Sequence, residues 1–245
     1  MIPISHLVIT FIILLAAGVG LTVPLFKFDY KKFIRSELFV KILFWIPIFI
    51  ILVGVLYANN PIRLSVLIVL LGASLAEVVR VIRIKRRPLF AIYYVLFAAS
   101  SACLIFIEMA RPGEFVNILI TLGFANVLAD VAAFFAGNYL GRHKLPKIFN
   151  PRKSWEGVGG ELVGALAGVL LVNQFVQPVL SLWLFLPIGL GSIIGDLANS
   201  YVKRQAGIKD WSRAIPGHGG FTDRLSSLAG SAALTYIFIL ITGLY

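Results

Sequence analysis

The stretch from residue 42 to residue 57 reads Ile42-Leu-Phe-Trp-Ile-Pro-Ile-Phe-Ile-Ile-Leu-Val-Gly-Val-Leu-Tyr57 and contains no charged side chain. Together with residues 39–41 it forms an apolar run over 39–57 that only Lys41 interrupts. A helix needs about 20 consecutive, mostly apolar residues to cross the hydrocarbon core of a bilayer. The run therefore predicts a membrane-spanning helix.

Runs of this kind recur along the whole chain. We expect eight spanning helices, over residues 5–26, 39–57, 62–80, 88–108, 115–137, 159–177, 179–201 and 225–245. The longest connections, 138–158 and 202–224, are too short for a soluble domain, which has about 50 residues or more. The sequence thus predicts an all-α, polytopic integral membrane protein with a single membrane domain over 1–245.

Lysine and arginine are distributed unevenly over the connections. The first, third, fifth and seventh connections, with Lys41 at the edge of the second run, contain all of the 22 Lys and Arg except Arg63 and Arg111. Cytoplasmic connections of membrane proteins accumulate Lys and Arg. The distribution predicts that these four connections face the cytoplasm and that both termini lie outside.

The composition supports a membrane protein and excludes several other classes. Hydrophobic residues make up 59% of the 245 residues and charged residues 13%, against about 25% charged in soluble domains. The net charge of +11 comes from short basic clusters between apolar runs, so we expect no nucleic-acid partner. Cys103, the only cysteine, excludes a disulfide framework and a cysteine metal site. The N-terminus lacks the basic region of a cleaved signal peptide, so we expect the first span to be retained.

Three glycines, Gly160, Gly164 and Gly168, are spaced by four in the sixth apolar run. Small residues at this spacing lie on one face of a helix and allow a second helix to approach closely. We therefore expect these glycines to serve helix packing rather than catalysis.

The segment between the last two runs is the most polar part of the chain. From Asp196, near the end of the seventh run, to Arg224 the chain contains three carboxylates, five cations and one histidine: Asp196, Asp210 and Asp223; Lys203, Arg204, Lys209, Arg213 and Arg224; and His218. Apolar runs long enough to span a membrane flank it on both sides. Charged groups held at a membrane surface beside helix ends predict a site for a phosphorylated ligand.

The same segment resembles the signature of the phosphatidate cytidylyltransferases, also called CDP-diacylglycerol synthases. The matching residues are Ser200, Lys203-Arg204, Lys209-Asp210, Pro216-Gly217-His218-Gly219-Gly220 and Asp223-Arg224. Three further segments look like motifs of this family: Asp130–Gly137, Asn150–Gly157 and Gly195–Leu197. The resemblance covers roughly residues 125–230, and the first four spans agree with the family only in being apolar.

The resemblance implies an enzyme of phospholipid biosynthesis. It would transfer CMP from CTP to phosphatidate or a related lipid phosphate, with CDP-diacylglycerol and pyrophosphate as products. The membrane domain would divide into N-terminal spans over 1–110 and catalytic spans and loops over 115–245. The catalytic residues would be Asp196, Lys209, Asp210, His218, Asp223 and Arg224. The substrate-binding residues would be Asp130, Lys153, Ser154, Ser200, Lys203, Arg204, Gly219 and Gly220.

Such a reaction places charge on several phosphate oxygens, which metal ions and cations have to neutralise. Mg²⁺ typically binds one or two carboxylates and completes its shell with water and phosphate oxygens. Asp196 at the end of the seventh span and Asp223 at the start of the eighth therefore form a candidate Mg²⁺ site, and a second cation is left open. The alternative is that both carboxylates cap helices or pair with Arg204 and Arg224.

His218 lies between glycines, where the backbone approaches a ligand closely and offers its N–H groups to phosphate. A phosphate monoester is largely ionised near pH 7, because its second pKa is about 6. We therefore expect His218 to position substrate rather than to act as a general base; a buried structural histidine is the alternative. Lys209 and Asp210 would bind pyrophosphate and orient nucleotide or metal, unless they form a surface ion pair.

Four further residues are interpreted from their position relative to the spans. Lys153 and Ser154 precede the sixth span, where the free N–H groups of a helix N-terminus bind an anion, although basic loops also satisfy the cytoplasmic charge bias. Asp130 lies about two turns inside the fifth span, where an ionisable group is costly and by default functional or paired. Glu77 in the third span has Arg80 as a partner at helical spacing.

Two residues depart from the family signature. The family has Glu directly before the residue that is Ser200 here, and Asp three residues after Asp223; this chain has Asn199 and Ser226 at those positions. A neutral hydroxyl ligates Mg²⁺ without adding charge, so Ser226 would be a weak ligand. An active enzyme with a relaxed site, an enzyme for a different lipid phosphate or nucleotide, and a paralogue without turnover all remain open.

The opposing class is a membrane protein without catalysis, either a transporter or a lipid-binding relative. A transporter gathers its polar groups near the bilayer midplane on interrupted helices, whereas here they gather at one membrane face. A lipid-alcohol kinase shares the apolar character, but the glycine loop around His218 resembles the cytidylyltransferases. We expect a multi-pass protein of the bacterial inner membrane with its site facing the cytoplasm; a homodimer is left open.

Overall fold

The computed structural model describes residues 3–85, 88–146, 148–149, 153–174, 179–215 and 219–244, apart from the side chains of Glu37, Lys41 and Lys85. Within these residues the chain forms helices and isolated β-bridges but no strand. The α-helices are α1 (Ile4–Thr22), α2 (Tyr30–Ile34), α3 (Glu37–Tyr57), α4 (Asn60–Lys85), α5 (Pro88–Ala110), α6 (Phe115–Tyr139), α7 (Trp155–Val172), α8 (Phe185–Ala206) and α9 (Phe221–Thr242); the 3₁₀-helices are η1 (Val23–Phe26) and η2 (Leu182–Leu184).

Eight helical segments of the described chain are long and apolar enough to cross a membrane. They cover Ile4–Phe26, Leu38–Tyr57, Asn60–Ile84, Pro88–Ala110, Phe115–Tyr139, Trp155–Val172, Leu182–Ala206 and Phe221–Thr242. These segments confirm the all-α architecture and the eight spans expected from the apolar runs. The protein is therefore a multi-pass membrane protein.

The seventh span ends later than the apolar run predicts. α8 continues to Ala206, where Gly207, with φ at +71°, ends it in the left-handed conformation that glycine adopts without strain. Lys203 and Arg204 therefore lie in the last turn of α8 and not in the connection after it. For the same reason Asp196 lies well inside α8, about 15 Å before the end of the helix.

The sixth and eighth spans begin earlier than the apolar runs predict. α7 begins at Trp155 because Ser154 caps it, and Ser154 Oγ accepts a hydrogen bond from Gly157 N at 3.2 Å. α9 begins at Phe221, so Asp223 lies in the first turn of the helix. In both cases the helix starts in polar residues, which hydropathy assigns to the connection.

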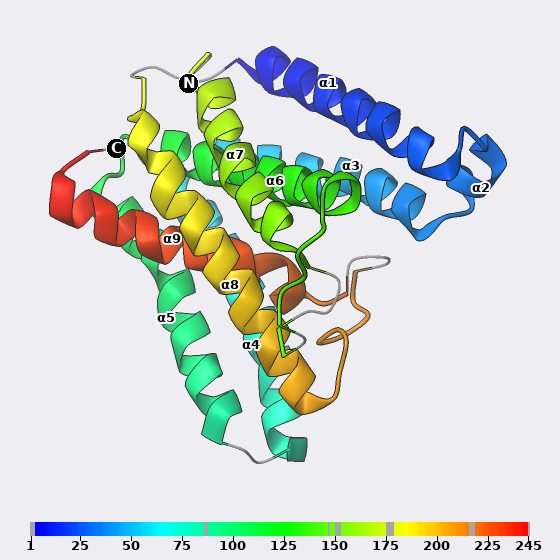
Figure 1. Ribbon diagram of the computed structural model, residues 1–245. Helices are drawn as coiled ribbons and strands as arrows, with labels where there is room; N and C mark the ends of the chain where they lie inside the picture. Colours follow the sequence, from blue (N-terminus) through cyan, green and yellow to red (C-terminus); the bar gives the residue numbers. More distant parts are fainter. Residues whose placement is uncertain are drawn as a thin grey trace.

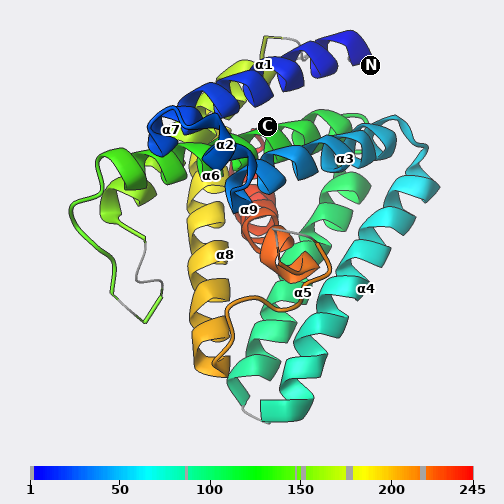
Figure 2. The ribbon, with the colours of Figure 1, turned by 90° about the vertical axis from the view of Figure 1, so that its right-hand side faces the viewer.

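Two closely packed helix pairs form the centre of the protein. α6 packs along α7, α8 packs along α9, and α7 contacts α8. α4 and α5 pack against each other and against α9, and Figure 2 shows the first turns of α9 between α4 and α8. α1 packs on α3, which reaches α6; Figure 1 shows α1 and α3 at the edge of the bundle.

The helices of both central pairs approach backbone to backbone. Gly160, Gly164 and Gly168 all face the backbone of α6, where an added methyl group would collide with it. Gly191 and Gly230 likewise face each other's carbonyl groups at the crossing of α8 and α9. The packing role expected of the three glycines in the sixth run is confirmed.

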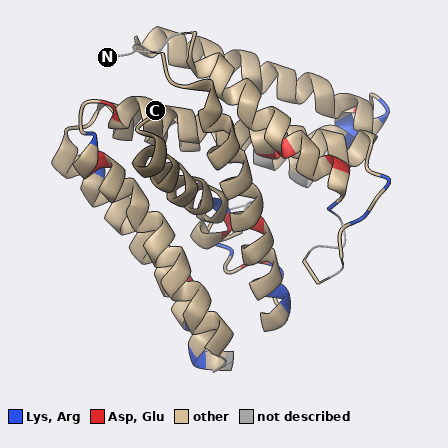
Figure 3. Cartoon of the chain, turned by 60° about the vertical axis from the view of Figure 1, so that its left-hand side comes forward, with Lys and Arg blue, Asp and Glu red and all other residues tan. Residues whose placement is uncertain are grey.

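Charge is concentrated at helix ends and in connections, and Figure 3 shows long uncharged stretches of helix between these places. Arg63 and Arg111, the two cations outside the four basic connections, each lie beside a carboxylate. Arg63 Nε is 3.4 Å from Glu108 Oε1, and both side chains are buried. Arg111 Nη1 is 3.7 Å from Glu114 Oε2. The positive charge of both residues is thus compensated locally.

Candidate active site

One face of α8 carries a row of polar side chains in the second half of the helix. Asp196, Asn199, Ser200 and Lys203 lie within two turns at helical spacing, which places them on one side of the helix. Asn199 and Ser200 are buried. The predicted site residues gather at the two ends of this row, around Asp196 and around Asp223 of α9.

Lys153 connects Asp196 to α7. Its Nζ forms an ion pair with Asp196 Oδ2 and lies 3.8 Å from Glu161 Oε2. Glu161 is buried in α7 and accepts a hydrogen bond from Ser192 Oγ at 2.7 Å. Burial acts to lower the pKa of Lys153, but the charges of Asp196 and Glu161 outweigh it and raise this pKa above its ordinary value. The ammonium group is therefore held in its charged form.

Asp130 belongs to the same group of charges. The charges of Asp196, Glu161, Arg224 and Lys153 all act on its carboxylate, although it lies on α6. The expectation that Asp130 lies about two turns inside its span is confirmed, because α6 ends at Tyr139. The structure thus brings together predicted residues from α6, α8, α9 and the fifth connection, and α7 adds Glu161.

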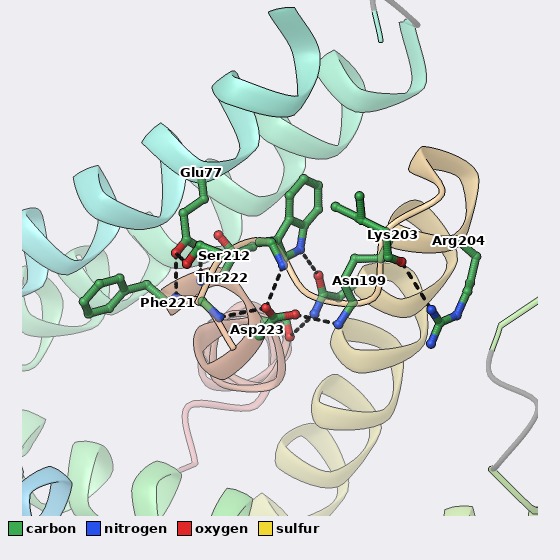
Figure 4. A network of polar contacts seen from close by, with 12 residues as sticks. Glu77, Asn199, Lys203, Arg204, Ser212, Phe221, Thr222 and Asp223 are labelled. Atoms are coloured by element: carbon green, nitrogen blue, oxygen red, sulfur yellow. Dashed lines mark hydrogen bonds and ion pairs between the residues drawn. The ribbon is translucent and has the colours of Figure 1, made fainter. Parts of the chain in front are cut away.

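Asp223 joins α9, α8 and the connection between them (Figure 4). Its Oδ1 accepts a hydrogen bond from Lys203 Nζ at 2.5 Å, and its Oδ2 accepts from Trp211 N and Gly220 N, both at 2.9 Å. Asp223, which lies in the first turn of α9, thus accepts a hydrogen bond from the backbone N–H of the N-cap residue Gly220. Of the alternative roles, a helix cap is observed for Asp223 only, because Asp196 lies inside α8. Both aspartates do pair with cations, but the partners are Lys153 and Lys203 and not Arg204 and Arg224.

Four predicted residues of the 207–220 connection and its flanks are exposed: Arg204, Lys209, Asp210 and Arg224. Arg204 Nη1 donates a hydrogen bond to Ile208 O at 3.2 Å. Lys209, Asp210 and Arg224 lie at the surface. In the described part of the chain, no ion pair joins Lys209 to Asp210.

The last two residues of the glycine loop lead into α9. Gly219 has φ at +82°, a conformation that favours glycine, and Ile215 N donates a hydrogen bond to Gly219 O at 2.8 Å. Gly220 is the N-cap residue of α9. His218 lies outside the described residues, as do Pro216 and Gly217.

Asn199 and Ser226, the two departures from the signature, contact each other. Asn199 Nδ2 donates to Ser226 Oγ at 3.1 Å, and Asn199 Oδ1 accepts from Tyr93 OH at 3.0 Å and from Trp211 Nε1 at 2.6 Å. The Tyr93 and Trp211 rings stack, with their centroids 5.7 Å apart. All four side chains are buried, so they form a neutral hydrogen-bonded cluster beside Asp223.

The fifth connection folds back on itself and presents Lys153 to α8. Lys144 and Ser154 form an isolated β-bridge, and Leu145 N donates a hydrogen bond to Lys153 O at 3.0 Å. Ser154 is buried and its hydroxyl oxygen is used as the cap of α7. The contact that the structure gives Ser154 is therefore structural, whereas Lys153 faces the charged group.

Four residues of the site were not predicted from the sequence: Glu77, Tyr93, Glu161 and Trp211. The interpretation that Glu77 pairs with Arg80 is wrong, because its carboxylate accepts hydrogen bonds from Ser212 and from the N-terminus of α9. For Glu77 and Glu161, a carboxylate inside an apolar span was the available signal. Nothing local in the sequence distinguished Tyr93 or Trp211 from other aromatic residues.

The donor groups near Asp196 and Asp223 suit a magnesium ion better than a metal that needs an all-protein shell. Among the described residues, no three His, Cys, Asp or Glu side chains form a metal-binding group. Mg²⁺ needs only one or two carboxylates, and Asp196 and Asp223 each face a lysine ammonium group, whose place a metal ion can take. These two carboxylates fit an ion that takes its remaining ligands from water and phosphate.

An apolar groove of about 240 Å³ lies between α1, α3 and α6. Its lining includes Leu21 of α1, Ile42 of α3, and Val127 and Val131 of α6. Asp130 lies between the two valines in sequence, so the groove reaches the depth of the charged group on α6.

The chain is similar to known cytidylyltransferases. The phosphatidate cytidylyltransferase of Brucella suis is 42% identical over 159 residues, which are 62% of this chain and 56% of that protein. Phosphatidate cytidylyltransferase 4, chloroplastic, of Arabidopsis thaliana is 41% identical over 130 residues, or 51% of this chain and 33% of that protein. The phosphatidate cytidylyltransferase of Mycobacterium bovis is 32% identical over 152 residues, or 61% and 48% of the two chains.

The matched segment spans about half the length of the two bacterial relatives and a third of the length of the plant relative. The sequence profile of the cytidylyltransferase family, in contrast, matches residues 1–242 of this chain. A match of that extent includes all eight candidate spans and both groups of charged residues. The protein belongs to the cytidylyltransferase family.

Proposed function

We propose that this protein is a phosphatidate cytidylyltransferase. It transfers the CMP group of CTP to phosphatidate or a related lipid phosphate and releases pyrophosphate, which yields CDP-diacylglycerol for phospholipid biosynthesis. The observation that carries the proposal is the convergence of signature residues from α8, the 207–220 connection and α9 on the carboxylate of Asp223. The names of the relatives support the same reaction.

The proposed reaction requires little covalent chemistry from the protein. An oxygen of the lipid phosphate attacks the α-phosphorus of CTP and forms a new P–O bond. The bond from the α-phosphorus to the oxygen that bridges to the β-phosphate breaks, and pyrophosphate leaves with the bonding electrons. Because a phosphate monoester is largely ionised near pH 7, the nucleophile needs no general base. The protein has to position both substrates and neutralise their charge.

Cationic side chains at the two ends of the polar row supply this neutralisation. Lys153, beside Asp130 and Asp196, binds the lipid phosphate or the triphosphate. Residues of α8, the 207–220 connection and α9 bind the nucleotide and pyrophosphate: Ser200, Lys203, Arg204, Lys209, Gly219, Gly220 and Arg224, with Asp210 orienting nucleotide or metal and His218 positioning substrate.

Asp196 and Asp223 are the residues that would hold Mg²⁺, in exchange for their contacts with Lys153 and Lys203. When bound, the ion neutralises charge on the phosphate oxygens. Ser226 offers at most a weak ligand to a second cation, because Asn199 already donates to its hydroxyl oxygen.

The orientation in the membrane is part of the proposal. Both termini lie outside and the four basic connections face the cytoplasm of a bacterial inner membrane, which places the charged groups where CTP is present. The apolar groove beside Asp130 accommodates an acyl chain of the lipid substrate. Within this proposal the spans and loops over 115–245 carry the reacting groups.

The experiment is to incubate the purified protein in detergent with labelled CTP, Mg²⁺ and phosphatidate, and to measure CDP-lipid. The unmodified protein is expected to form product and Asp223→Ala is not. No product with any of several lipid phosphates would favour the alternative, a paralogue of altered substrate or without catalysis that binds or transports lipid. Equal product from both proteins would remove Asp223 from the site and leave the function standing.

A further inference from the structure

Glu77 is a carboxylate inside the third span, and the hydrogen-bond partners that the described residues give it lie in the C-terminal segment (Figure 4). Its Oε1 accepts from Ser212 Oγ at 2.6 Å and from Phe221 N at 3.0 Å, and its Oε2 accepts from Thr222 N at 2.9 Å. Among the described residues, no Lys, Arg or His forms an ion pair with it. Backbone and hydroxyl donors therefore hold the charge of Glu77.

The N-terminus of α9 is shared between Glu77 and Asp223. The first N–H groups of a helix have no partner within the helix, and the positive end of the helix dipole favours a carboxylate there. Asp223 takes the N–H of Gly220, and Glu77 takes those of Phe221 and Thr222. Two carboxylates from distant parts of the chain thus satisfy three consecutive N–H groups. One of these carboxylates, Asp223, is a predicted metal ligand.

The Glu77 carboxylate is closely surrounded by residues of α9 and of the connection before it. A methyl group on Gly220 would lie 2.5 Å from both carboxylate oxygens of Glu77, so only glycine leaves room for them. Thr222 Oγ1 donates to Ser74 O at 2.9 Å, which adds a second link between α4 and α9. Ser212 Oγ also accepts a hydrogen bond from Ala214 N at 3.1 Å, so the connection before the glycine loop is tied to the same carboxylate.

We propose that Glu77 is a positioning residue of the active site, which fixes the first turn of α9 and the 212–214 segment and thereby directs the Asp223 carboxylate. Asp223 is two residues after Phe221, so the direction of its side chain depends on the turn that Glu77 holds. The role of Glu77 in turnover rests on the proposed function, whereas its hydrogen bonds to the 212–214 segment and to α9 are observed independently of that function. The site is then incomplete without the N-terminal half of the chain.

Replacement of Glu77 by glutamine tests the inference with little change in size. The amide has one acceptor oxygen, so its NH₂ group must face a backbone N–H, and the first turn of α9 loses a partner. We expect kcat for CDP-lipid to fall about 100-fold, as for other displacements of a reacting group. The Mg²⁺ concentration for half-maximal rate is expected to rise, while KM for the lipid changes little. Arg80→Gln, one turn away on the same helix and exposed, is the matched control and is expected to leave all three unchanged.

Hydrogen exchange in the segment 219–226 provides a readout that does not require activity. We expect faster exchange in Glu77→Gln and no change in Arg80→Gln. Unchanged exchange would overturn the inference, and faster exchange with an unchanged kcat would reduce Glu77 to a structural residue. If the unmodified protein forms no CDP-lipid, the proposed function fails, and exchange alone decides whether Glu77 holds the first turn of α9.

Two further variants keep the test decisive if Glu77→Gln does not fold. Ser212→Ala removes one hydrogen bond and leaves both backbone contacts, so a smaller loss of kcat is expected; none would contradict the role of Glu77 in holding the 212–214 segment. Gly220→Ala places its methyl group against the Glu77 oxygens and is expected to slow turnover strongly. In a Glu77→Ala background the same substitution should cost much less, and an equal cost in both backgrounds would overturn the inference.

Discussion

Two ion pairs of this protein, Arg63 with Glu108 and Lys203 with Asp223, are largely buried and are built differently. Arg63 Nε lies 3.4 Å from Glu108 Oε1, yet Arg63 Nε and Nη1 and both oxygens of Glu108 make no hydrogen bond within the described structure. Asp223, in contrast, accepts hydrogen bonds from Lys203 and from two backbone N–H groups. The first pair only compensates two buried charges, whereas the second also fixes the direction of a carboxylate.

This difference separates a structural pair from a candidate functional one. Two apolar side chains of similar volume often replace a buried ion pair without loss of stability. No apolar side chain replaces a carboxylate that a metal or phosphate site requires in one direction. We therefore expect substitutions at Arg63 and Glu108 to change stability, and substitutions at Asp223 to change turnover.

The largest effect is expected for Asp223→Asn. The amide keeps the size of the side chain, but it removes the charge, and its NH₂ group must face Lys203 or the N–H groups of Trp211 and Gly220. We expect CDP-lipid formation to fall about 100- to 1000-fold, the range for loss of one electrostatic group in an active site. The assay uses labelled CTP and phosphatidate, with circular dichroism as the check on folding. A folded variant with more than a tenth of the original rate would contradict the distinction between Asp223 as a functional carboxylate and Arg63–Glu108 as a structural pair.

Arg63→Ala is expected to have the second largest effect, on stability alone. It leaves Glu108 buried without a partner and should lower the free energy of unfolding by about 3–5 kcal/mol. The double variant Arg63→Met with Glu108→Leu removes both charges and should recover most of that loss and keep CDP-lipid formation. Thermal unfolding in detergent measures the stability of both variants, and the labelled-CTP assay measures their CDP-lipid formation. A double variant as unstable as the single one would show that the pair does more than compensate charge.

A smaller effect is expected where Asn199 and Ser226 meet. Asn199→Glu combined with Ser226→Asp places two carboxylates in contact, which disfavours their ionised forms unless a cation lies between them. Thermal stability should fall without Mg²⁺ and recover when Mg²⁺ is added, whereas the unmodified protein should show little Mg²⁺ dependence at this cluster. Ser226→Asp alone should lower the Mg²⁺ concentration for half-maximal rate. If neither readout responds to Mg²⁺, these positions lie too far from the metal site.

Lys32→Ala is expected to have the smallest effect. Its Nζ lies 3.6 Å from Asp29 Oδ2, with 77% of the lysine side chain exposed. Exposed pairs of this kind contribute about 0–1 kcal/mol, so the unfolding temperature should barely change. A loss comparable to that of Arg63→Ala would mean that burial does not explain the difference between the pairs.

The apolar runs predicted the eight spans because a bilayer imposes a length and a composition on any helix that crosses it. They did not predict the bounds of the helices at the site, because α8 continues through polar residues to Ala206 and α9 begins at Phe221, before its apolar run. Helix signals such as a glycine after the last turn or a serine before the first were present at Gly207 and Ser154. Hydropathy alone ignores them.

The site was predicted as a set of residues but not as a set of contacts. Asp196 and Asp223 were placed near cations, yet their lysine partners come from a distant connection and from another turn of α8. Glu77 is separated from Ser212 by 135 residues, and no local pattern indicates such a contact. Helix periodicity fixes which residues share a face, whereas the neighbour of that face depends on the packing of the whole bundle.

The glycine contacts between α6 and α7 and between α8 and α9 also restrict how this protein can diverge. No side chain fits at Gly164, Gly191 or Gly230, so the helices that hold the charged residues have little freedom to exchange residues at these interfaces. Gly18 and Gly20 of α1 and Gly54 of α3, in contrast, have open space around them. A lineage that adapts to new membrane lipids therefore has room for substitutions in α1 and α3, while the reacting groups stay in place.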